Sequence, residues 1–509
     1  MRINRREFLK IGISATLALE GVSTINKLQT NLVNASQLSL DSKASVIGVE
    51  EKDVLYFKYE VGGKEIRHNY VFGSEIYSQP NIPKPEKGKP YFDPIFGTKI
   101  TRISDRKIDK LDFWVKKEYG SLMQPAYPKH NYDNADGSYL LFQGSYGSGQ
   151  VLYDAKSFKL IKSLDTRAVN WNQTVDPRWD AHNPDMLYYY FSPPTALSKY
   201  NVKTDKFGII HDFDKDFPGA TSITMAEEGD CSYDSRYFAF ALLAPRRGDM
   251  WVGVAVFCYD RIEDRIVGKI DLPIKGFEKQ GAGNWVGMSP SGKYVLLGTA
   301  PMLVYDREFK KPPVKLTHGG GWHCDVGLDD EGREVILYRG GRPYSPGAQS
   351  DGCYAMCDLE TGTETVLSGK IGGPEVGVPD IHFDCSSIFT PGWGLVSTFH
   401  PAPIKQSHWT EYSIHLVELT RRKNPLLRVW RICHTHVNQE GYNDCPFATF
   451  GRFGTKIFFG SNWGTPIGKG GDIDVYQVEL PPNWYEDLMG KEKATKLHKI
   501  AEEMVRKKW

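Results

Sequence analysis

The sequence predicts an all-β fold: a seven-bladed β-propeller closed by an N-terminal strand and followed by a short C-terminal helix. Three observations predict it. They are a turn-and-strand core that recurs seven times, a second hairpin behind these cores, and an unpaired hairpin near the start of the chain. With 509 residues, of which 40% are hydrophobic, the chain has ample material for a core and fits no disordered or fibrous class.

Each core combines a tight turn with a run of apolar, β-branched and aromatic residues. The seven cores lie at 135–142, 182–190, 233–240, 290–297, 330–337, 390–397 and 452–459. The Asp, Gly, Ser and Asn residues suit a reversal, and the apolar residues that follow suit a central, buried strand. Units that recur roughly every 40 to 60 residues are typical of propeller blades.

A second hairpin follows several cores and predicts the third and fourth strands of a blade; its cues begin at Tyr153, Tyr259, Tyr305 and Cys357. The last unit ends at 472–480 without a fourth strand, whereas 93–103 forms a hairpin with no inner pair before it. We therefore expect Gly97–Ile103 to complete blade seven and close the ring, which removes exposed sheet edges. An open sandwich does not explain the unpaired hairpin.

Four regions follow from this pattern: residues 1–35 as a signal peptide, 36–92 as an N-terminal extension and Pro-rich linker, 93–482 as the propeller, and 483–509 as a C-terminal helix. In the extension, a short hairpin precedes the linker at 80–94. In the last region, Leu488, Leu497, Ile500, Ala501 and Met504 recur at helical spacing, which predicts a helix docked on the surface.

The N-terminus resembles a twin-arginine export signal. Arg5 and Arg6 precede Phe8-Leu9-Lys10, an apolar stretch runs from Ile11 to Leu19, and 33–35 offers a small-x-small cleavage site. The apolar stretch is too short to be a permanent anchor, so we expect no membrane span after signal cleavage. The expected partner during export is the twin-arginine translocase, and the expected location is periplasmic or extracellular.

Charge and cysteine content narrow the function classes. The chain carries 63 basic and 62 acidic residues, a formal net charge of +1, which gives no electrostatic reason to expect nucleic acid as a partner. Eight scattered cysteines lack the paired C-x-x-C spacing of a structural zinc site. Disulfides are permitted in an oxidising compartment, and buried free thiols are an equal alternative.

The first strand of each blade lines the central channel, so residues at its start converge on one mouth. The positions that we expect there are Gln124, Trp179, Asp180, Asp230, Asn284, Trp285, His323, Asp325, His382, Asp384, Asn443 and Asp444. Any single polar residue there is more often a structural group that ties blades together than a functional one. As a converging cluster, they predict a site for an oligosaccharide or another small-molecule ligand.

The segment before blade seven adds an H-x-H pair, His434 and His436, followed by Gln439. In an extended segment both imidazoles point to the same side, with Cα atoms about 7 Å apart, which suits two ligands of one ion. Joined by His382 or His323, they predict a divalent metal site compatible with Mn, Zn or Fe. His400 is a further candidate ligand.

A seven-bladed ring with inward histidines resembles the oligogalacturonate lyases. That family holds a manganese-type ion through three histidines and a glutamine, and cleaves uronate oligomers by β-elimination. The resemblance covers most of residues 93–480 and implies His382, His434 and His436 as ligands. The glutamine departs from the family pattern: Arg431 stands where it is expected, and Gln439 lies downstream.

The resemblance also implies roles in catalysis. The ion, with Arg339 or Arg342, would neutralise the uronate carboxylate, and a neutral His323 would abstract the neighbouring proton. Trp285, Trp322 and Trp463 offer faces for sugar stacking, or alternatively pack between blades. The expected substrate contacts are Asp230, Asn284, Trp285, Trp322, Asn443 and Asp444. The competing class is a non-catalytic propeller that binds a glycan, peptide or protein partner, and a third is a propeller oxidoreductase with an organic cofactor.

Overall fold

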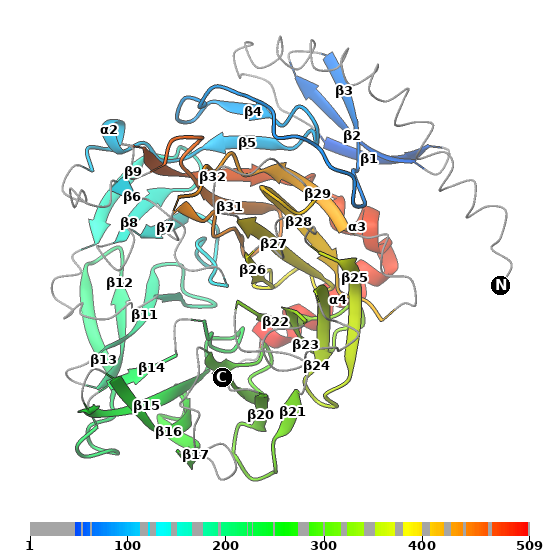
Figure 1. Ribbon diagram of the computed structural model, residues 1–509. Helices are drawn as coiled ribbons and strands as arrows, with labels where there is room; N and C mark the ends of the chain where they lie inside the picture. The colour runs from blue at the N-terminus through cyan, green and yellow to red at the C-terminus, as the bar shows by residue number, and fades with distance from the viewer. Residues whose placement is uncertain are drawn as a thin grey trace, which may run out of the picture.

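Seven antiparallel sheets form a ring around a central axis in the computed structural model (Figure 1). It describes residues 46–506 apart from gaps at 52–53, 62–63, 112–120, 123–128, 144–149, 165–176, 192–194, 221, 226–227, 248–249, 273–284, 299–300, 317–322, 341–351, 372–379, 400–407, 422–428, 441–443 and 467–470. The predicted seven-bladed propeller is confirmed.

Blades two to six have four strands each, ordered from the channel outwards. Blade two consists of β10 (Arg178–Trp179), β11 (Met186–Phe191), β12 (Ala196–Asn201) and β13 (Lys206–Asp212). Blade three consists of β14 (Ser222–Thr224), β15 (Tyr237–Arg247), β16 (Met250–Asp260) and β17 (Arg265–Asp271). Blade four consists of β18 (Val286–Met288), β19 (Tyr294–Leu297), β20 (Met302–Asp306) and β21 (Val314–Leu316).

Blade five consists of β22 (Asp325–Leu328), β23 (Glu334–Arg339), β24 (Cys353–Asp358) and β25 (Glu364–Lys370). Blade six consists of β26 (Asp380–Asp384), β27 (Trp393–Phe399), β28 (Ser413–Glu418) and β29 (Val429–His434). Blade one has three strands, β7 (Tyr139–Gln143), β8 (Gln150–Asp154) and β9 (Leu160–Leu164). A single bridge from Asp133 to Leu140 stands where its first strand is expected.

Ring closure occurs in blade seven, as the sequence predicts. Three strands of this blade follow one another near the end of the sequence: β30 (Thr449–Phe450), β31 (Lys456–Ser461) and β32 (Asp472–Glu479). The N-terminal strand β5 (Lys99–Arg102) supplies the fourth by pairing antiparallel with β32, with Tyr476 opposite Arg102 and Glu479 opposite Lys99. Beyond it, β4 (Pro90–Phe92) adds a fifth strand, and β6 (Ser121–Leu122) pairs parallel with the start of β32.

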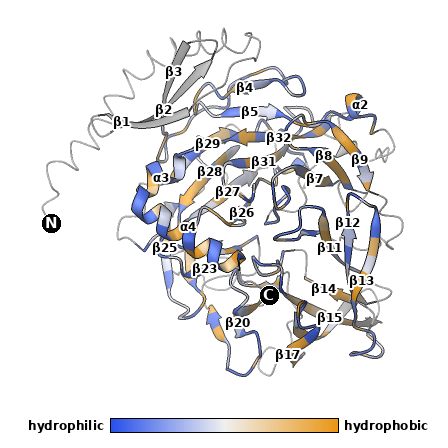
Figure 2. Cartoon of the chain, turned by 180° about the vertical axis from the view of Figure 1, so that it is seen from behind, coloured by the Kyte–Doolittle hydropathy of each residue, from blue (hydrophilic) through white to orange (hydrophobic). Residues whose placement is uncertain are grey.

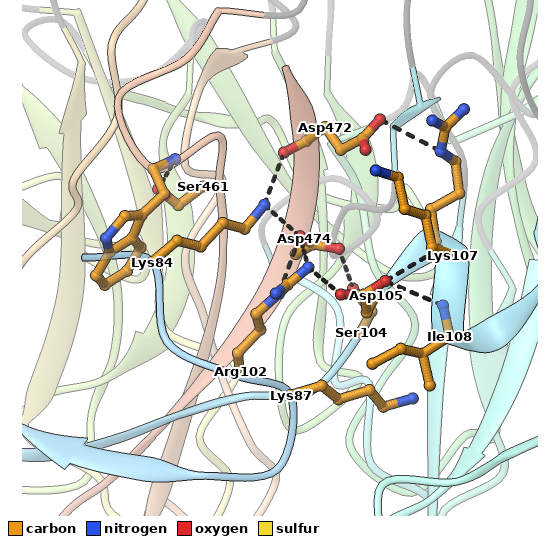
Figure 3. A network of polar contacts seen from close by, with 12 residues as sticks. Lys84, Lys87, Arg102, Ser104, Asp105, Lys107, Ile108, Ser461, Asp472 and Asp474 are labelled. Atoms are coloured by element: carbon orange, nitrogen blue, oxygen red, sulfur yellow. Dashed lines mark hydrogen bonds and ion pairs between the residues drawn. The ribbon is translucent and has the colours of Figure 1, made fainter. Parts of the chain in front are cut away.

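A network of charged side chains fixes the closing strand (Figure 3). The carboxylate of Asp474, on β32 and 1% exposed, lies 2.6 Å from Lys84 Nζ and 2.7 Å from Arg102 Nη2. Ser104 donates to the same carboxylate. Arg102 also bonds Asp105 at 2.6 Å, and Asp105 caps the short helix α2 (Arg106–Asp109). The network therefore ties the linker, β5 and β32 to one another.

The segment before the ring covers an outer edge rather than the channel. Phe72 forms a bridge to Trp430, and Arg431 donates its amide to Val71, so this segment pairs with the outermost strand of blade six. The guanidinium of Arg431 bonds the carbonyl oxygens of Glu75 and Trp409. Further upstream, β1 (Val46–Glu51), β2 (Val54–Val61) and β3 (Lys64–Asn69) form a separate three-stranded sheet.

The core lies between blades, where the apolar faces of adjacent sheets meet. Between blades five and six, for example, Tyr354 and Met356 pack with Phe383 and Val396, all at most 1% exposed. These residues belong to the central strands, where β-branched and aromatic side chains fit a surface covered on both faces. The ring is therefore held by seven such interfaces in series.

Two helices follow the last blade, and the second covers the end of the channel opposite the starts of the first strands. The predicted single helix is divided at Gly490 (φ +80°) into α3 (Trp484–Met489) and α4 (Lys491–Val505). Figures 1 and 2 show α4 running from above blades five and six towards the middle of the ring, with both polar and apolar residues along it.

The end of α4 packs against three blades: Ala501 and Val505 contact Ala181 of blade two, Tyr233 of blade three and Ile388 of blade six. Tyr233 donates to the carbonyl of Cys385 across the axis. These contacts form a floor to the channel. Among the helices that the structure describes, none is long and apolar enough to cross a bilayer.

We predict that Asp474→Asn weakens ring closure. It removes the carboxylate that pairs Lys84 with Arg102 and leaves a largely buried guanidinium short of a partner, which costs about 3 kcal/mol. Asp472→Asn is the matched control on the same strand, since its contact with Arg106 is 3.4 Å long and partly exposed, worth at most about 1 kcal/mol. Urea unfolding measures both, and equal effects would contradict this role of Asp474.

Candidate functional site

Polar side chains from non-adjacent blades meet across the upper part of the channel. Lys129, which precedes blade one, contacts Glu228 of blade three at 2.7 Å. Glu228 in turn contacts His323, which precedes blade five, and the His323 ring lies 4.4 Å from that of His382 in blade six. Contacts that skip a blade are possible only across the axis, so this chain of four residues crosses the channel.

Glu228 orients His323 through two contacts. The amide of His323 donates to Glu228 Oε2 at 3.1 Å, and Nδ1 of the imidazole lies 3.3 Å from Glu228 Oε1. Burial alone raises the pKa of this carboxyl, but the Lys129 ammonium and the His323 contact hold the pKa below its ordinary value. Glu228 is therefore ionised at neutral pH and faces the imidazole of His323.

Two of the four residues that cross the channel adopt backbone conformations that are rare for their residue types. Lys129 has φ +97° and His323 has φ +54°. Left-handed conformations cost non-glycine residues energy and persist where surrounding contacts hold them, which is frequent at functional sites. Here the ion pair to Glu228 supplies such a contact for each residue.

His382 lies deeper than His323. It is 1% exposed and its ring also packs 4.8 Å from Phe447. Burial, together with the charges of His323 and Lys129, holds the pKa of His382 well below its ordinary value. His382 is therefore neutral at physiological pH, and His323 is the histidine of this pair that lies beside a carboxylate.

A second charged group, Asp230, lies next to these four residues. Asp230 accepts a 2.7 Å hydrogen bond from Arg178 Nε, and its other oxygen lies 4.0 Å from His130 Nδ1. Burial opposes ionisation of Asp230, yet Arg178 and His130 hold its pKa below the ordinary value. Arg178 also bonds the carbonyl of Gly229, which fixes the guanidinium between blades two and three.

Few side chains of this charged cluster are accessible to a ligand. The side chains of Lys129, Glu228 and Arg178 are at most 5% exposed, whereas His323 is 21% and Asp230 is 31% exposed. Two cations, Lys129 and Arg178, balance two carboxylates. The cluster thus exposes an imidazole and a carboxylate to a ligand. The charges of its two cations and two carboxylates cancel.

Other predicted channel residues tie the blades together. Asp325 accepts from the amide of Cys385 at 2.5 Å, and Asp384 accepts from Thr449 Oγ1 at 2.9 Å and from the amide of Phe450. Burial, with the neighbouring carboxyl of Asp384, raises the pKa of Asp325 well above its ordinary value. These acids therefore join blade five to six and blade six to seven.

The four predicted metal ligands are not brought together. In blade six, His382 pairs with Ser397, Ser397 with Ile414, and Ile414 with Cys433. His434 is thus three strands, roughly 14 Å, from His382. His434 Nε2 bonds the carbonyl of Tyr77 at 2.8 Å, and His436 stacks on Trp463 at 4.1 Å.

The H-x-H pair instead holds the N-terminal segment. Nδ1 of His434 lies 3.8 Å from Asp93, and the backbone amide of His436 donates to the side-chain oxygen of Gln79 at 2.9 Å. Burial lowers the pKa of His436 to about 4. Gln439 donates to Cys445 Sγ at 3.3 Å. Within the described residues, no three His, Cys, Asp or Glu side chains are grouped to hold a metal ion, so His382, His434 and His436 do not form the three-histidine set of the implied manganese site.

The remaining predicted contacts are divided between the core and undescribed regions. Trp285 is 1% exposed and packs between blades four and five, so its ring offers no face to a sugar. Asp444 accepts from Asn462 and from the amide of Glu440. Arg339 ends β23, two residues beyond the partner of Asp325. The positions outside the described residues are Gln124, Asn284, Trp322, Arg342, His400 and Asn443.

Sequence reasoning missed Lys129, His130, Arg178 and Glu228. Two of them lie within two residues of expected channel positions: Arg178 is beside Trp179, and Glu228 is two before Asp230. Lys129 and His130 follow Gln124 by five and six residues, before a first strand reduced to one bridge. Widening the search to charged residues on either side of each expected strand start finds all four.

Comparisons with known proteins bear on the fold. No family model and no curated protein matches the chain. Oligogalacturonate lyase from Vibrio parahaemolyticus superposes with a TM-score of 0.50 at 11% identity, covering 78% of this chain and 97% of that one. Hydrazine synthase from Kuenenia stuttgartiensis gives a TM-score of 0.40 at 13% identity, with 71% and 98% coverage.

The Cps50 (Swd1) propeller domain of Myceliophteria thermophila gives a TM-score of 0.40 at 12% identity, covering 70% of this chain and 98% of that one. At these identities the likeness is one of fold alone. The chain is a seven-bladed β-propeller similar in fold to oligogalacturonate lyase.

Proposed function

We propose that this protein is a carbohydrate-active lyase that performs β-elimination on uronate-containing oligosaccharides in its central channel. The observation that carries the proposal is the contact between His323 and Glu228, an accessible imidazole whose Nδ1 faces a buried, ionised carboxylate. A carboxylate in that place fixes the orientation of the ring and stabilises the charge that it acquires as a general base.

The chemistry requires removal of a proton from the carbon beside the uronate carboxylate. His323 takes this proton on the ring nitrogen that does not face Glu228. The electron pair of the broken C–H bond forms a carbon–carbon double bond, and the bond to the leaving glycosidic oxygen breaks. That oxygen receives its proton from solvent, so the products are a shortened sugar and an unsaturated uronate.

The substrate carboxylate needs a cation, because electron density builds up beside it during proton removal. The charges of Lys129 and Arg178 are already balanced by Glu228 and Asp230. Arg339, at the end of the strand beside His323, is the described residue that we assign to this role. Arg342, outside the described residues, remains the second candidate from the sequence.

We predict that His323→Ala lowers kcat on a galacturonate oligomer by at least about 100-fold, because general-base catalysis contributes that much or more. The ultraviolet absorbance of the unsaturated uronate product measures it. His498→Ala, on the exposed face of α4, is the control and should leave the rate unchanged. Binding of the oligomer without any unsaturated product from the wild type would instead support a non-catalytic glycan-binding propeller.

We predict a related effect at Glu228. Glu228→Gln should reduce kcat by about 100-fold with little change in KM, since a misplaced base costs that much without weakening binding. It also leaves Lys129 buried without its counter-charge, so the double variant Lys129→Met/Glu228→Gln separates the two consequences. The double variant should regain thermal stability and remain slow. Recovery of the rate along with stability would show that the ion pair serves the fold alone.

We also propose that the chain is exported through the twin-arginine pathway. All eight cysteines lie within the described residues, and each is buried with a reduced thiol. A chain that folds in the reducing cytoplasm before export buries its thiols without forming disulfides, and this supports the proposal.

We predict that replacing both Arg5 and Arg6 with Lys leaves an unprocessed precursor in the cytoplasm, measured by cell fractionation and mass of the N-terminus. Arg2→Lys, outside the paired arginines, is the control and should be processed normally. Equal processing of the two proteins would contradict twin-arginine export.

A further inference from the structure

One exposed member of the channel cluster carries a negative charge. Lys129 and Arg178 are at most 5% exposed and each lies 2.7 Å from a carboxylate, whereas the Asp230 side chain is 31% exposed. Although burial opposes its ionisation, Arg178 and His130 hold the pKa of Asp230 below its ordinary value. A ligand in the channel therefore contacts the negative charge of Asp230 more directly than the positive charge of Lys129 or Arg178.

The two oxygens of the Asp230 carboxylate have different surroundings. Oδ1 accepts hydrogen bonds from Arg178 Nε and from the backbone amide of Cys231, both at 2.7 Å. Oδ2 has no donor within hydrogen-bonding distance among the described residues, and the ring nitrogen Nδ1 of His130 lies 4.0 Å from it. Each oxygen of a carboxylate can accept about two hydrogen bonds. The contacts of Oδ1 thus hold the side chain in place, and Oδ2 is left to a donor from a ligand, such as a sugar hydroxyl.

Asp230 lies close to the base of the proposed reaction. Glu228 is 3.3 Å from Nδ1 of His323 and precedes Asp230 by two residues, so the Cα atoms of the two acids are at most about 7 Å apart. The sugar unit beside the one at His323 therefore lies near Asp230. Arg339 is the single described cation that the proposed function assigns to the substrate, and it serves the carboxylate of the reacting unit. A carboxylate on the neighbouring unit would face the like charge of Asp230.

We infer that the substrate is an oligosaccharide in which a neutral sugar adjoins the reacting uronate, and that a hydroxyl of this neutral unit donates to Asp230 Oδ2. The inference rests on the proposed function, because it names the class of uronate oligosaccharide that the same site accepts. A second uronate in that place is disfavoured, since repulsion between two partly hydrated like charges roughly 6 Å apart lowers affinity about tenfold. Asp230 is then the residue that selects mixed oligosaccharides over polyuronates.

The test uses two trisaccharides that differ only in their outer units: the galacturonate trimer, and one galacturonate flanked by two galactose units. The ultraviolet absorbance of the unsaturated product gives kcat/KM for each, and the wild type should favour the flanked trisaccharide about tenfold. Asp230→Asn removes the charge with little change in size, so kcat/KM for the trimer should rise and the ratio should fall to about one. Asp271→Asn, on the exposed outer strand of blade three, is the matched control and should keep the wild-type ratio.

Asp230→Asn also leaves the Arg178 guanidinium without its carboxylate, so thermal unfolding is measured for each variant. The double variant Arg178→Gln/Asp230→Asn removes both charges and should show the same ratio of about one. A wild-type ratio of one or below would overturn the inference, as would a tenfold preference that survives in both Asp230 variants.

Failure of the proposed function gives a different result. If neither trisaccharide yields an unsaturated product, the proposed function fails, and calorimetric binding of the two trisaccharides then decides the role of Asp230. Tighter binding of the flanked trisaccharide that is lost in Asp230→Asn would support selection by this carboxylate. Equal binding of the two, or binding of neither, would overturn it.

Discussion

The pairing of β5 with β32 is the constraint on which the site depends. It joins the N-terminal strand to the last blade, with Ile100 opposite Val478 and Thr101 opposite Gln477. A closed ring fixes the distance of every first strand from the axis, whereas an open array of blades does not. Only in the closed ring do Lys129, Glu228 and His323, from three blades that are not neighbours, come within hydrogen-bonding distance. Closure therefore positions the site as well as protecting the sheet edges.

The charges in the channel serve stability and chemistry together. A buried ammonium such as that of Lys129 is tolerated only with a counter-charge, and Glu228 supplies it across the axis. The same carboxylate then has a second oxygen for His323. Helix α4 and the blade turns cover the other end of the channel. The exposed side chains of the cluster therefore lie at the end that carries His323. The ion pair between Lys129 and Glu228 thus fixes the place at which a ligand can contact the oriented imidazole of His323.

The sequence predicted the ring well because each blade repeats one local signal. Tight turns such as 135–138 are followed by apolar strands, and both are decided by neighbours in the chain. The closing strand followed from a count of unpaired hairpins, and the convergence of His323, His382 and Asp230 followed from the ring. Lys129 was beyond such reasoning, because its role depends on Glu228, 99 residues away, and on a backbone conformation (φ +97°) that its residue type does not signal.

His434 and His436 show why spacing alone did not predict which histidines lie together in the ring. Two residues apart on an extended segment, they share a side, and that much followed from the sequence. Their distance from the axis did not, because it depends on which strand of the blade carries them. His434 ends β29, the outermost strand of blade six, where it meets the N-terminal segment at Tyr77 and Asp93. Where an imidazole has a carbonyl on one nitrogen and a carboxylate near the other, it holds segments together. His323, on the inner side of blade five, has its carboxylate partner and an exposed edge, and this difference in depth within the ring separates a structural histidine from a candidate base.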